Sequence, residues 1–118
     1  MLIAVIDDDD AVRESVAGLV TQLGCRVEMF ASASEFLAFP ELLGTSCIIT
    51  DVQMPQMSGI ELHDRLRAQG YNIPTILVTG YPDEEDRTRA LAAGVVCYLS
   101  KPVDKDDLIG CVRTAMQA

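Results

Sequence analysis

Residues 74–79 have the sequence Pro-Thr-Ile-Leu-Val-Thr, a nearly continuous apolar run that is followed by Gly80. Strands with one face in water alternate apolar and polar residues, whereas strands covered on both faces are apolar almost throughout, as in parallel sheets. Four further short apolar runs occur, at residues 2–6, 25–30, 47–50 and 95–99. In the run at 25–30, Arg26 and Glu28 alternate with apolar residues, which predicts an edge strand. The sequence therefore predicts a parallel sheet of five strands.

Helical patterns separate these runs. The first has apolar residues at i, i+4, i+7, i+8 and i+11 and is ended by Gly24; its members are Val12, Val16, Leu19, Val20 and Leu23. Ser32 and Glu35 have the spacing of a capping box, which predicts the start of a second helix. Further helices are predicted at residues 59–69, 83–93 and 104–116.

Strand and helix alternate five times, and this order predicts an α/β fold with right-handed crossovers and helices on both faces of the sheet. A closed barrel of eight strands needs a chain longer than 118 residues. A five-stranded, doubly wound parallel sheet remains. Because 118 residues hold one core, we expect a single domain over residues 1–118.

The composition is strongly acidic, with 9 basic and 18 acidic side chains and a formal net charge of −9. Such a surface repels phosphate backbones and anionic lipids, so we expect no direct binding to nucleic acid or membrane. No apolar run approaches the ~20 residues that span a bilayer, and the first residues lack the basic segment of a signal peptide. The sequence predicts a cytoplasmic protein.

The four cysteines, Cys25, Cys47, Cys97 and Cys111, form no C-x-x-C pair. An even number of cysteines is compatible with disulfides, but nothing else in the sequence indicates secretion, so we expect buried free thiols. The single histidine, His63, has no zinc-site spacing to these cysteines. We expect His63 to be exposed on a helix.

Ligands of doubly wound sheets bind at the carboxyl ends of the strands. The residues at or just past these ends are therefore candidates for chemistry. Asp7 and Asp8 follow the first run and Asp51 follows the third. Thr79 ends the fourth run and Lys101 follows the fifth. The fold thus predicts that three carboxylates, one hydroxyl and one ammonium converge in one crevice.

Three neighbouring carboxylates repel one another unless a cation lies among them. Oxygen ligands favour Mg²⁺ over Zn²⁺. A metal ion, a hydroxyl and an ammonium can together contact the equatorial oxygens of a transferring phosphoryl group. A carboxylate can be the nucleophile and become an acyl phosphate. The pattern therefore predicts phosphoryl chemistry on Asp51.

At these positions the chain resembles the receiver domains of two-component response regulators, over its whole length. The residues that carry the resemblance are Asp7-Asp8, the loop Asp51-Val52-Gln53-Met54-Pro55-Gln56-Met57-Ser58-Gly59, Thr79-Gly80, Tyr98 and Lys101-Pro102. Residues 11–15 and 36–38 resemble receivers of the nitrogen-fixation and LuxR-type transcription regulators. The resemblance implies a flavodoxin-like sheet with strand order 2-1-3-4-5.

The resemblance also implies a role for each matching residue. Asp51 accepts a phosphoryl group from a sensor histidine kinase. Asp8, Asp51 and the backbone carbonyl of Gln53 hold Mg²⁺, and Asp7 assists. Thr79, with Gly80 beside it, and Lys101 contact the phosphoryl group, and the peptide before Pro102 is cis. Tyr98 turns inward as Thr79 moves.

The resemblance implies a phosphorylated switch rather than an enzyme. The face formed by the fourth helix, fifth strand and fifth helix would change on phosphorylation and contact an output domain, a partner or a second copy. Gln53 and Tyr81 occupy positions that vary within the family and could set the lifetime of the phosphoryl group. The Tyr81 side chain could shield the acyl phosphate from water, or the Tyr81-Pro82 loop could hold it outward.

Three alternatives remain open at this point. A phosphatase of the haloacid-dehalogenase kind would use Asp7 and Asp9 in a D-x-D pattern, but would leave Asp51 without a role. A docking module that is not phosphorylated would not need Asp51, Thr79 and Lys101 together. A flavodoxin-like cofactor binder would need a phosphate-binding loop after the first strand. We expect either Asp9 or Asp10 to cap the first helix instead of joining the site.

Overall fold

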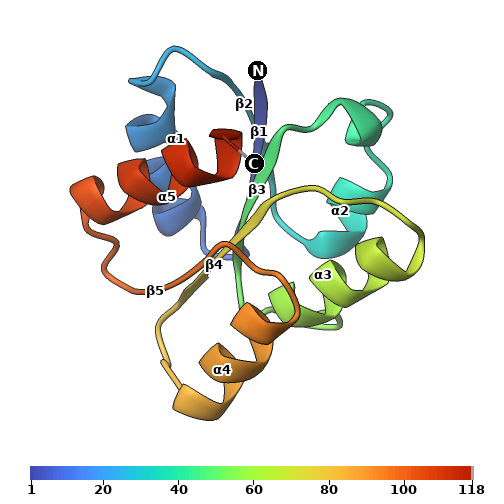
Figure 1. The fold of residues 1–118 in the computed structure, drawn as a ribbon. Helices are drawn as coiled ribbons and strands as arrows, with labels where there is room; N and C mark the ends of the chain where they lie inside the picture. The colour runs from blue at the N-terminus through green and yellow to red at the C-terminus, as the bar shows by residue number, and fades with distance from the viewer. Residues whose placement is uncertain (118) are drawn as a thin grey trace.

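The computed structural model describes residues 1–117 and shows one five-stranded parallel sheet with strand order β2-β1-β3-β4-β5 (Figure 1). The strands are β1 (Leu2–Ile6), β2 (Arg26–Phe30), β3 (Cys47–Asp51), β4 (Thr75–Thr79) and β5 (Cys97–Ser100). The helices are α1 (Asp10–Thr21), α2 (Ala33–Leu37), α3 (Gly59–Ala68), α4 (Glu84–Ala92) and α5 (Lys105–Gln117), with a short 3₁₀ helix η1 (Leu42–Gly44). The predicted α/β class and the strand order are confirmed.

The helices cover both faces of the sheet, and the core is correspondingly split in two. On one face, α1 and α5 pack on side chains such as Ile3, Val5 and Ile76 (Figure 1). On the other face, α2 and α3 pack on Ala4 and Ile6, and α4 covers a smaller cluster around Leu77. Successive residues of one strand therefore enter opposite cores, which explains why the central strands are apolar throughout.

Capping residues fix where the helices begin. Asp9 accepts a hydrogen bond from Val12 N at 3.1 Å and is the N-cap of α1, as predicted for one of the two acids. Ser58 and Glu61 form a complete capping box at α3. The box predicted at α2 is half formed: Ser32 caps Glu35 N, whereas the Glu35 carboxylate accepts from Ala31 N.

The prediction that His63 is exposed is wrong. His63 is only 5% exposed and lies on the inward side of α3. It follows Leu62 and precedes Leu66 by three positions, so it belongs to the same buried stripe of the helix. Burial and the charge of Arg67 lower the pKa of His63 from 6.5, and Asp64 opposes this in part.

The prediction of free thiols is wrong for two of the four cysteines. Cys97 of β5 and Cys111 of α5 form a disulfide with a Cα–Cα distance of 6.1 Å. Cys47 is free and buried, and Cys25 is free and half-buried. The pairing has no local signature because 14 positions separate the two residues, and only the packing of α5 against the sheet brings them together.

No helix in the described part of the chain is both long enough and apolar enough to cross a bilayer.

Candidate functional site

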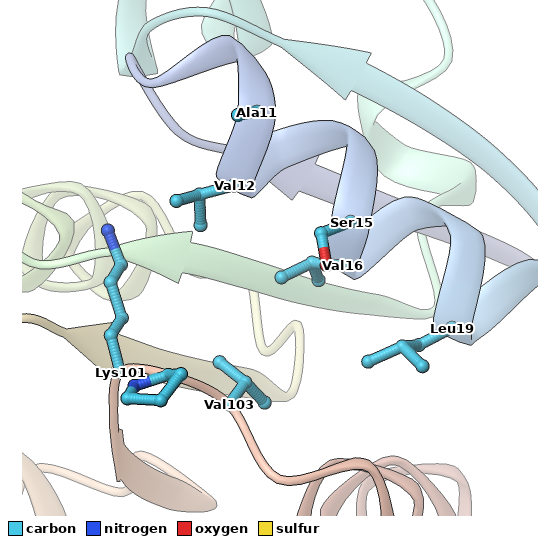
Figure 2. Close-up of a pocket in the computed structure, with 8 residues that line it drawn as sticks. Ala11, Val12, Ser15, Val16, Leu19, Lys101 and Val103 are labelled. Atoms are coloured by element: carbon cyan, nitrogen blue, oxygen red, sulfur yellow. The ribbon is translucent and has the colours of Figure 1, made fainter.

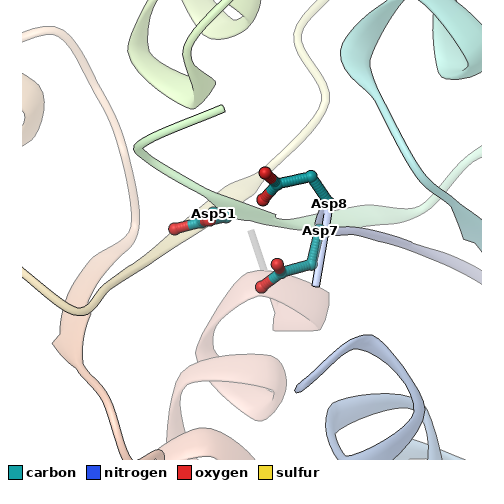
Figure 3. A group of neighbouring side chains, drawn as sticks. All are labelled: Asp7, Asp8 and Asp51. Atoms are coloured by element: carbon teal, nitrogen blue, oxygen red, sulfur yellow. The ribbon is translucent and has the colours of Figure 1, made fainter. Parts of the chain in front are cut away.

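Three carboxylates meet at the carboxyl end of the sheet (Figure 3). Asp7 and Asp8 follow β1, and Asp51 is the last residue of β3. The two strands are neighbours with Ile6 opposite Thr50, which places the acids side by side. One oxygen from each of Asp7, Asp8 and Asp51 lies within 4.8 Å of the others. Asp7 and Asp51 are buried, at 4% and 5% exposure, and Asp8 is exposed.

Lys101 brings the positive charge. It follows β5 in the loop that leads to α5, and its backbone N–H donates to Thr79 O at 2.8 Å. Its Nζ lies 3.1 Å from Asp7 Oδ2 and 3.4 Å from Asp51 Oδ1. Burial by itself would lower the pKa of Lys101, but the hydrogen bond with Asp7 and the charge of Asp51 outweigh it and raise the pKa above 10.5. Lys101 therefore remains an ammonium, and its peptide bond to Pro102 is cis.

The groups around Asp51 carry more negative than positive charge. Burial and the charge of Asp7 raise the pKa of Asp51, and Lys101 offsets only part of this rise. Asp51 Oδ1 is buried and accepts no well-formed hydrogen bond from the described residues, and its contact with Lys101 Nζ at 3.4 Å is an ion pair. A buried carboxylate oxygen without a hydrogen bond is costly, and a bound metal ion would add to the compensation that Lys101 gives. The three clustered carboxylates therefore fit a hard divalent cation.

The hydroxyl of Thr79 already has two partners. It donates to Gln53 Oε1 at 2.6 Å and accepts from Tyr81 N at 3.0 Å. Thr79 is fully buried, whereas Gln53 is an exposed loop residue that reaches in with its side chain. The sequence predicted that the backbone carbonyl of Gln53 is a metal ligand and that Gln53 influences the lifetime of the phosphoryl group, and both stay predictions. The side-chain contact was missed because nothing local to Gln53 points to Thr79, 26 positions away.

Gly59 packs directly against the acceptor strand. A Cβ at this position would lie 2.4 Å from the backbone oxygen of Asp51, which is far closer than real contacts. Gly59 N also donates to Val52 O at 3.0 Å. The glycine at the start of α3 thus allows the helix to approach Asp51. Its signal in the sequence was its place at the end of the loop that follows Asp51.

The other predicted residues surround this centre. Gly80 lies against the Lys101 side chain, since a Cβ there would be 3.9 Å from Lys101 Cδ. Tyr98 is half-buried and packs on the cluster that contains Leu77, and its hydroxyl accepts from Asp83 N at 3.2 Å. Tyr81 is 77% exposed, so in this conformation its loop holds the side chain outward.

An apolar cleft adjoins the site (Figure 2). It has a volume of about 250 Å³ and lies between α1 and the loop from Lys101 to Val103. Its walls are mainly aliphatic side chains, including Val12 and Leu19. The Lys101 side chain extends past this cleft toward the acidic cluster. A partner that filled the cleft would therefore sit beside Asp51.

The family model of the response regulator receiver domain matches residues 3–113. The chain belongs to this family. Receivers of this kind are phosphoacceptors rather than catalytic enzymes, and the acidic cluster of Asp7, Asp8 and Asp51 is the one expected of them. Asp9 caps α1 and stands outside the cluster, so the D-x-D pattern of a phosphatase has no structural counterpart.

Two curated relatives match nearly the whole chain. It is 39% identical over 116 residues to the response regulator protein TmoT of Ectopseudomonas mendocina, covering 98% of this chain and 53% of the relative. It is 42% identical over 112 residues to the transcriptional regulatory protein FixJ of Azorhizobium caulinodans, covering 95% and 53%. The chain thus spans about half the length of these relatives.

Solved structures agree. A crystal structure titled FixJ-N superposes with a TM-score of 0.87 at 36% identity, covering 98% of this chain and 93% of that one. The response regulator StyR gives a TM-score of 0.89 at 35% identity, covering 98% and 59%. A BeF3-activated DrrB receiver domain gives a TM-score of 0.87 at 28% identity, covering 99% and 97%.

Proposed function

We propose that residues 1–118 form one cytoplasmic receiver domain that accepts a phosphoryl group from a sensor histidine kinase onto Asp51. The observation that carries this proposal is the buried Asp51, whose Oδ1 accepts no well-formed hydrogen bond and lies beside the Lys101 ammonium and two further carboxylates. Lys101 Nζ contacts both buried acids, Asp7 at 3.1 Å and Asp51 at 3.4 Å, and Asp51 is the one that ends β3. The net charge of −9 argues against direct contact of this domain with nucleic acid.

Mg²⁺ is the cation that the donor set favours, because every clustered side-chain donor is a carboxylate oxygen. Asp8 and Asp51 would hold it together with the Gln53 backbone carbonyl, and Asp7 would assist. When bound, the ion supplies positive charge that neutralises the phosphoryl oxygens.

The residues of the chain perform the transfer itself. A carboxylate oxygen of Asp51 attacks phosphorus, the O–P bond forms and the N–P bond of the phosphohistidine breaks, leaving the electron pair on the imidazole nitrogen. Lys101 is held 3.4 Å from Asp51 Oδ1, where its ammonium can donate to a phosphoryl oxygen. The Thr79 hydroxyl can do the same after it leaves Gln53.

The hydrogen bonds of Thr79 and Tyr98 suggest how phosphorylation would change the conformation. When the Thr79 hydroxyl turns to the phosphoryl group, Tyr81 N also loses its partner, and the loop after β4 is freed. Tyr98 can then turn inward and release Asp83 N at the start of α4. The face formed by α4, β5 and α5 would change in consequence. Its use for homodimer formation is part of this proposal, and the partly exposed Leu91 of α4 supplies apolar surface for it.

The kinase would dock over the cleft between α1 and the loop after Lys101. That cleft is apolar and borders the site, so a helix that filled it could present a histidine to Asp51. The relatives named above are transcriptional or response regulators of about twice this length. We therefore propose that the output is control of transcription by a further domain.

One experiment tests the central claim. The protein is incubated with Mg²⁺ and acetyl phosphate and analysed by intact mass spectrometry. Wild type should gain one phosphoryl group, and Asp51→Asn should gain none. An unmodified wild type, or equal labelling of Asp51→Asn, would refute the proposal.

A further inference from the structure

The Cys97–Cys111 disulfide links two of the three elements of the face formed by α4, β5 and α5, and neither cysteine is among the residues assigned to phosphoryl transfer. It joins the first residue of β5 to the middle of α5. Disulfides are rare in the cytoplasm, where glutathione keeps most thiols reduced, and those that occur there are commonly transient or redox-sensing. A disulfide between two elements of the face formed by α4, β5 and α5 is therefore a candidate for redox regulation of that face.

We propose that Cys97 and Cys111 are a reversible redox modification site, which a small disulfide such as oxidised glutathione closes and excess thiol opens. The backbone geometry supports closure without rearrangement. The Cα–Cα distance of 6.1 Å lies within the usual range for disulfides. Both side chains point to the same core, between the sheet and α5.

Exposure differs between the two cysteines. Cys97 is half-buried and lies on β5, an edge strand with a neighbour on one side only. Cys111 is 9% exposed. A reagent therefore reaches Cys97 first, and Cys111 is placed to resolve the intermediate.

The chemistry balances with one molecule of oxidised glutathione. The Cys97 thiolate attacks one sulfur of glutathione disulfide and releases one glutathione thiolate. The Cys111 thiolate then attacks Sγ of Cys97, and the second glutathione leaves. The protein loses two hydrogens, and the oxidant becomes two molecules of glutathione.

The two remaining cysteines do not compete. Cys47 is fully buried, and burial, with the nearby Cys25, raises the pKa of its thiol to about 12. Its thiol therefore stays protonated and unreactive. Cys25 is half-buried and lies before β2, at the opposite edge of the sheet from β5.

Closure forms a covalent ring from residue 97 to residue 111, and the ring contains functional residues. Tyr98 is next to Cys97, and Lys101 lies in the loop that the ring closes. Oxidation would restrain this loop and fix α5 against β5. The oxidised form should therefore resist the movement of the face formed by α4, β5 and α5. This consequence rests on the proposed function, whereas the thiol chemistry does not.

The test uses the whole chain equilibrated in a series of glutathione redox buffers. After acid quench, denaturation and alkylation with N-ethylmaleimide, mass spectrometry counts free thiols. We expect four labels in the reduced protein and two in the oxidised protein, since Cys25 and Cys47 stay free. Trypsin should release peptides 90–105 and 106–113 joined by a disulfide. Four free thiols in every buffer, or a bond that includes Cys25 or Cys47, would overturn the proposal.

Two further measurements test whether the Cys97–Cys111 disulfide restrains the face formed by α4, β5 and α5. Oxidised wild type should have a Tm roughly 5–15 °C above that of reduced wild type, and α5 amides should exchange at least tenfold more slowly. Cys97→Ser should lose both differences, and the matched Cys25→Ser should keep them. Equal rates of amide exchange in oxidised and reduced wild type would overturn the proposal that the disulfide restrains α5. If acetyl phosphate failed to label the protein, the proposed phosphoryl transfer would be refuted. The disulfide proposal would stand, because the number of free thiols does not depend on that labelling.

Discussion

The Thr79 hydroxyl donates a hydrogen bond to Oε1 of Gln53 at 2.6 Å. The hydroxyl that the proposed switch requires is thus already engaged by a side chain of the acceptor loop. A phosphoryl group on Asp51 must compete with this amide, so Gln53 opposes switching in the resting state.

Gln53→Ala should therefore make switching easier. The variant keeps the backbone carbonyl but removes the competing acceptor, which is worth roughly 1 kcal/mol, or about fivefold in an equilibrium constant. Binding of beryllium fluoride with Mg²⁺, followed by calorimetry, should be about fivefold tighter than in wild type. Gln69→Ala, an exposed change at the end of α3, is the control. Weaker binding by Gln53→Ala alone would show that the amide assists instead.

Mg²⁺ should stabilise the protein through the acidic cluster. Saturation to about ten times the dissociation constant should raise Tm by roughly 5 °C. Asp8→Asn removes one of the three clustered carboxylates, so most of that increase should disappear. Asp106→Asn, which removes an exposed acid at the start of α5, should keep it. The measurement is thermal unfolding by circular dichroism, because the chain contains no tryptophan for fluorescence. An equal increase in both variants would exclude Asp8 as a ligand.

Stability should fall in mild acid because of His63. Its pKa in the folded protein is lowered below 6.5, so between these two values the unfolded chain binds more protons. The free energy of unfolding therefore rises with pH across this window. The contribution of His63 is complete above about pH 6.5 and is lost as the pH falls through the folded pKa.

The variant His63→Gln isolates this contribution. Denaturant unfolding of both proteins from pH 5 to pH 8 should show a smaller pH dependence in the variant, whatever its stability at neutral pH. Parallel curves would mean that other groups cause the acid sensitivity.

Ser15→Arg should separate kinase docking from chemistry. Ser15 is exposed on α1 and lines the cleft beside Lys101. Arginine there would fill part of the cleft and should slow phosphoryl transfer from a kinase at least tenfold. Labelling by acetyl phosphate should be unchanged, since the site itself is intact. Thr114→Arg adds the same group to the exposed side of α5, away from the cleft, and should leave both reactions unaffected.

The fold was predictable because its signals are local. Apolar runs, Gly24 and the capping residues each indicate an element from neighbouring residues alone, and alternation then determines the class. The strand order was implied only by the resemblance, because periodicity carries no information about which strands pair. The short β5 was predicted two positions early, since Val95 and Val96 are apolar but pack just before the strand.

Some contacts of the site were not predictable from the sequence. The convergence of Asp7, Asp8 and Asp51 follows from strand ends at one edge of a sheet, so a correct fold implied it. The Gln53–Thr79 hydrogen bond and the Cys97–Cys111 bond depend instead on side-chain directions across 26 and 14 positions. The burial of His63, in contrast, was predictable from the sequence, because His63 lies on the same side of the helix as Leu62 and Leu66. The prediction of exposure relied on the polarity of histidine and not on this spacing.

The contact between Gly59 and the Asp51 carbonyl has a mechanical consequence. With no room for even a methyl group between them, any side chain at position 59 would push the first turn of α3 away from the last residue of β3. The loop of residues 52–58, which joins the two, would then have to change shape. The position of the proposed acceptor loop therefore depends on a residue that has no side chain.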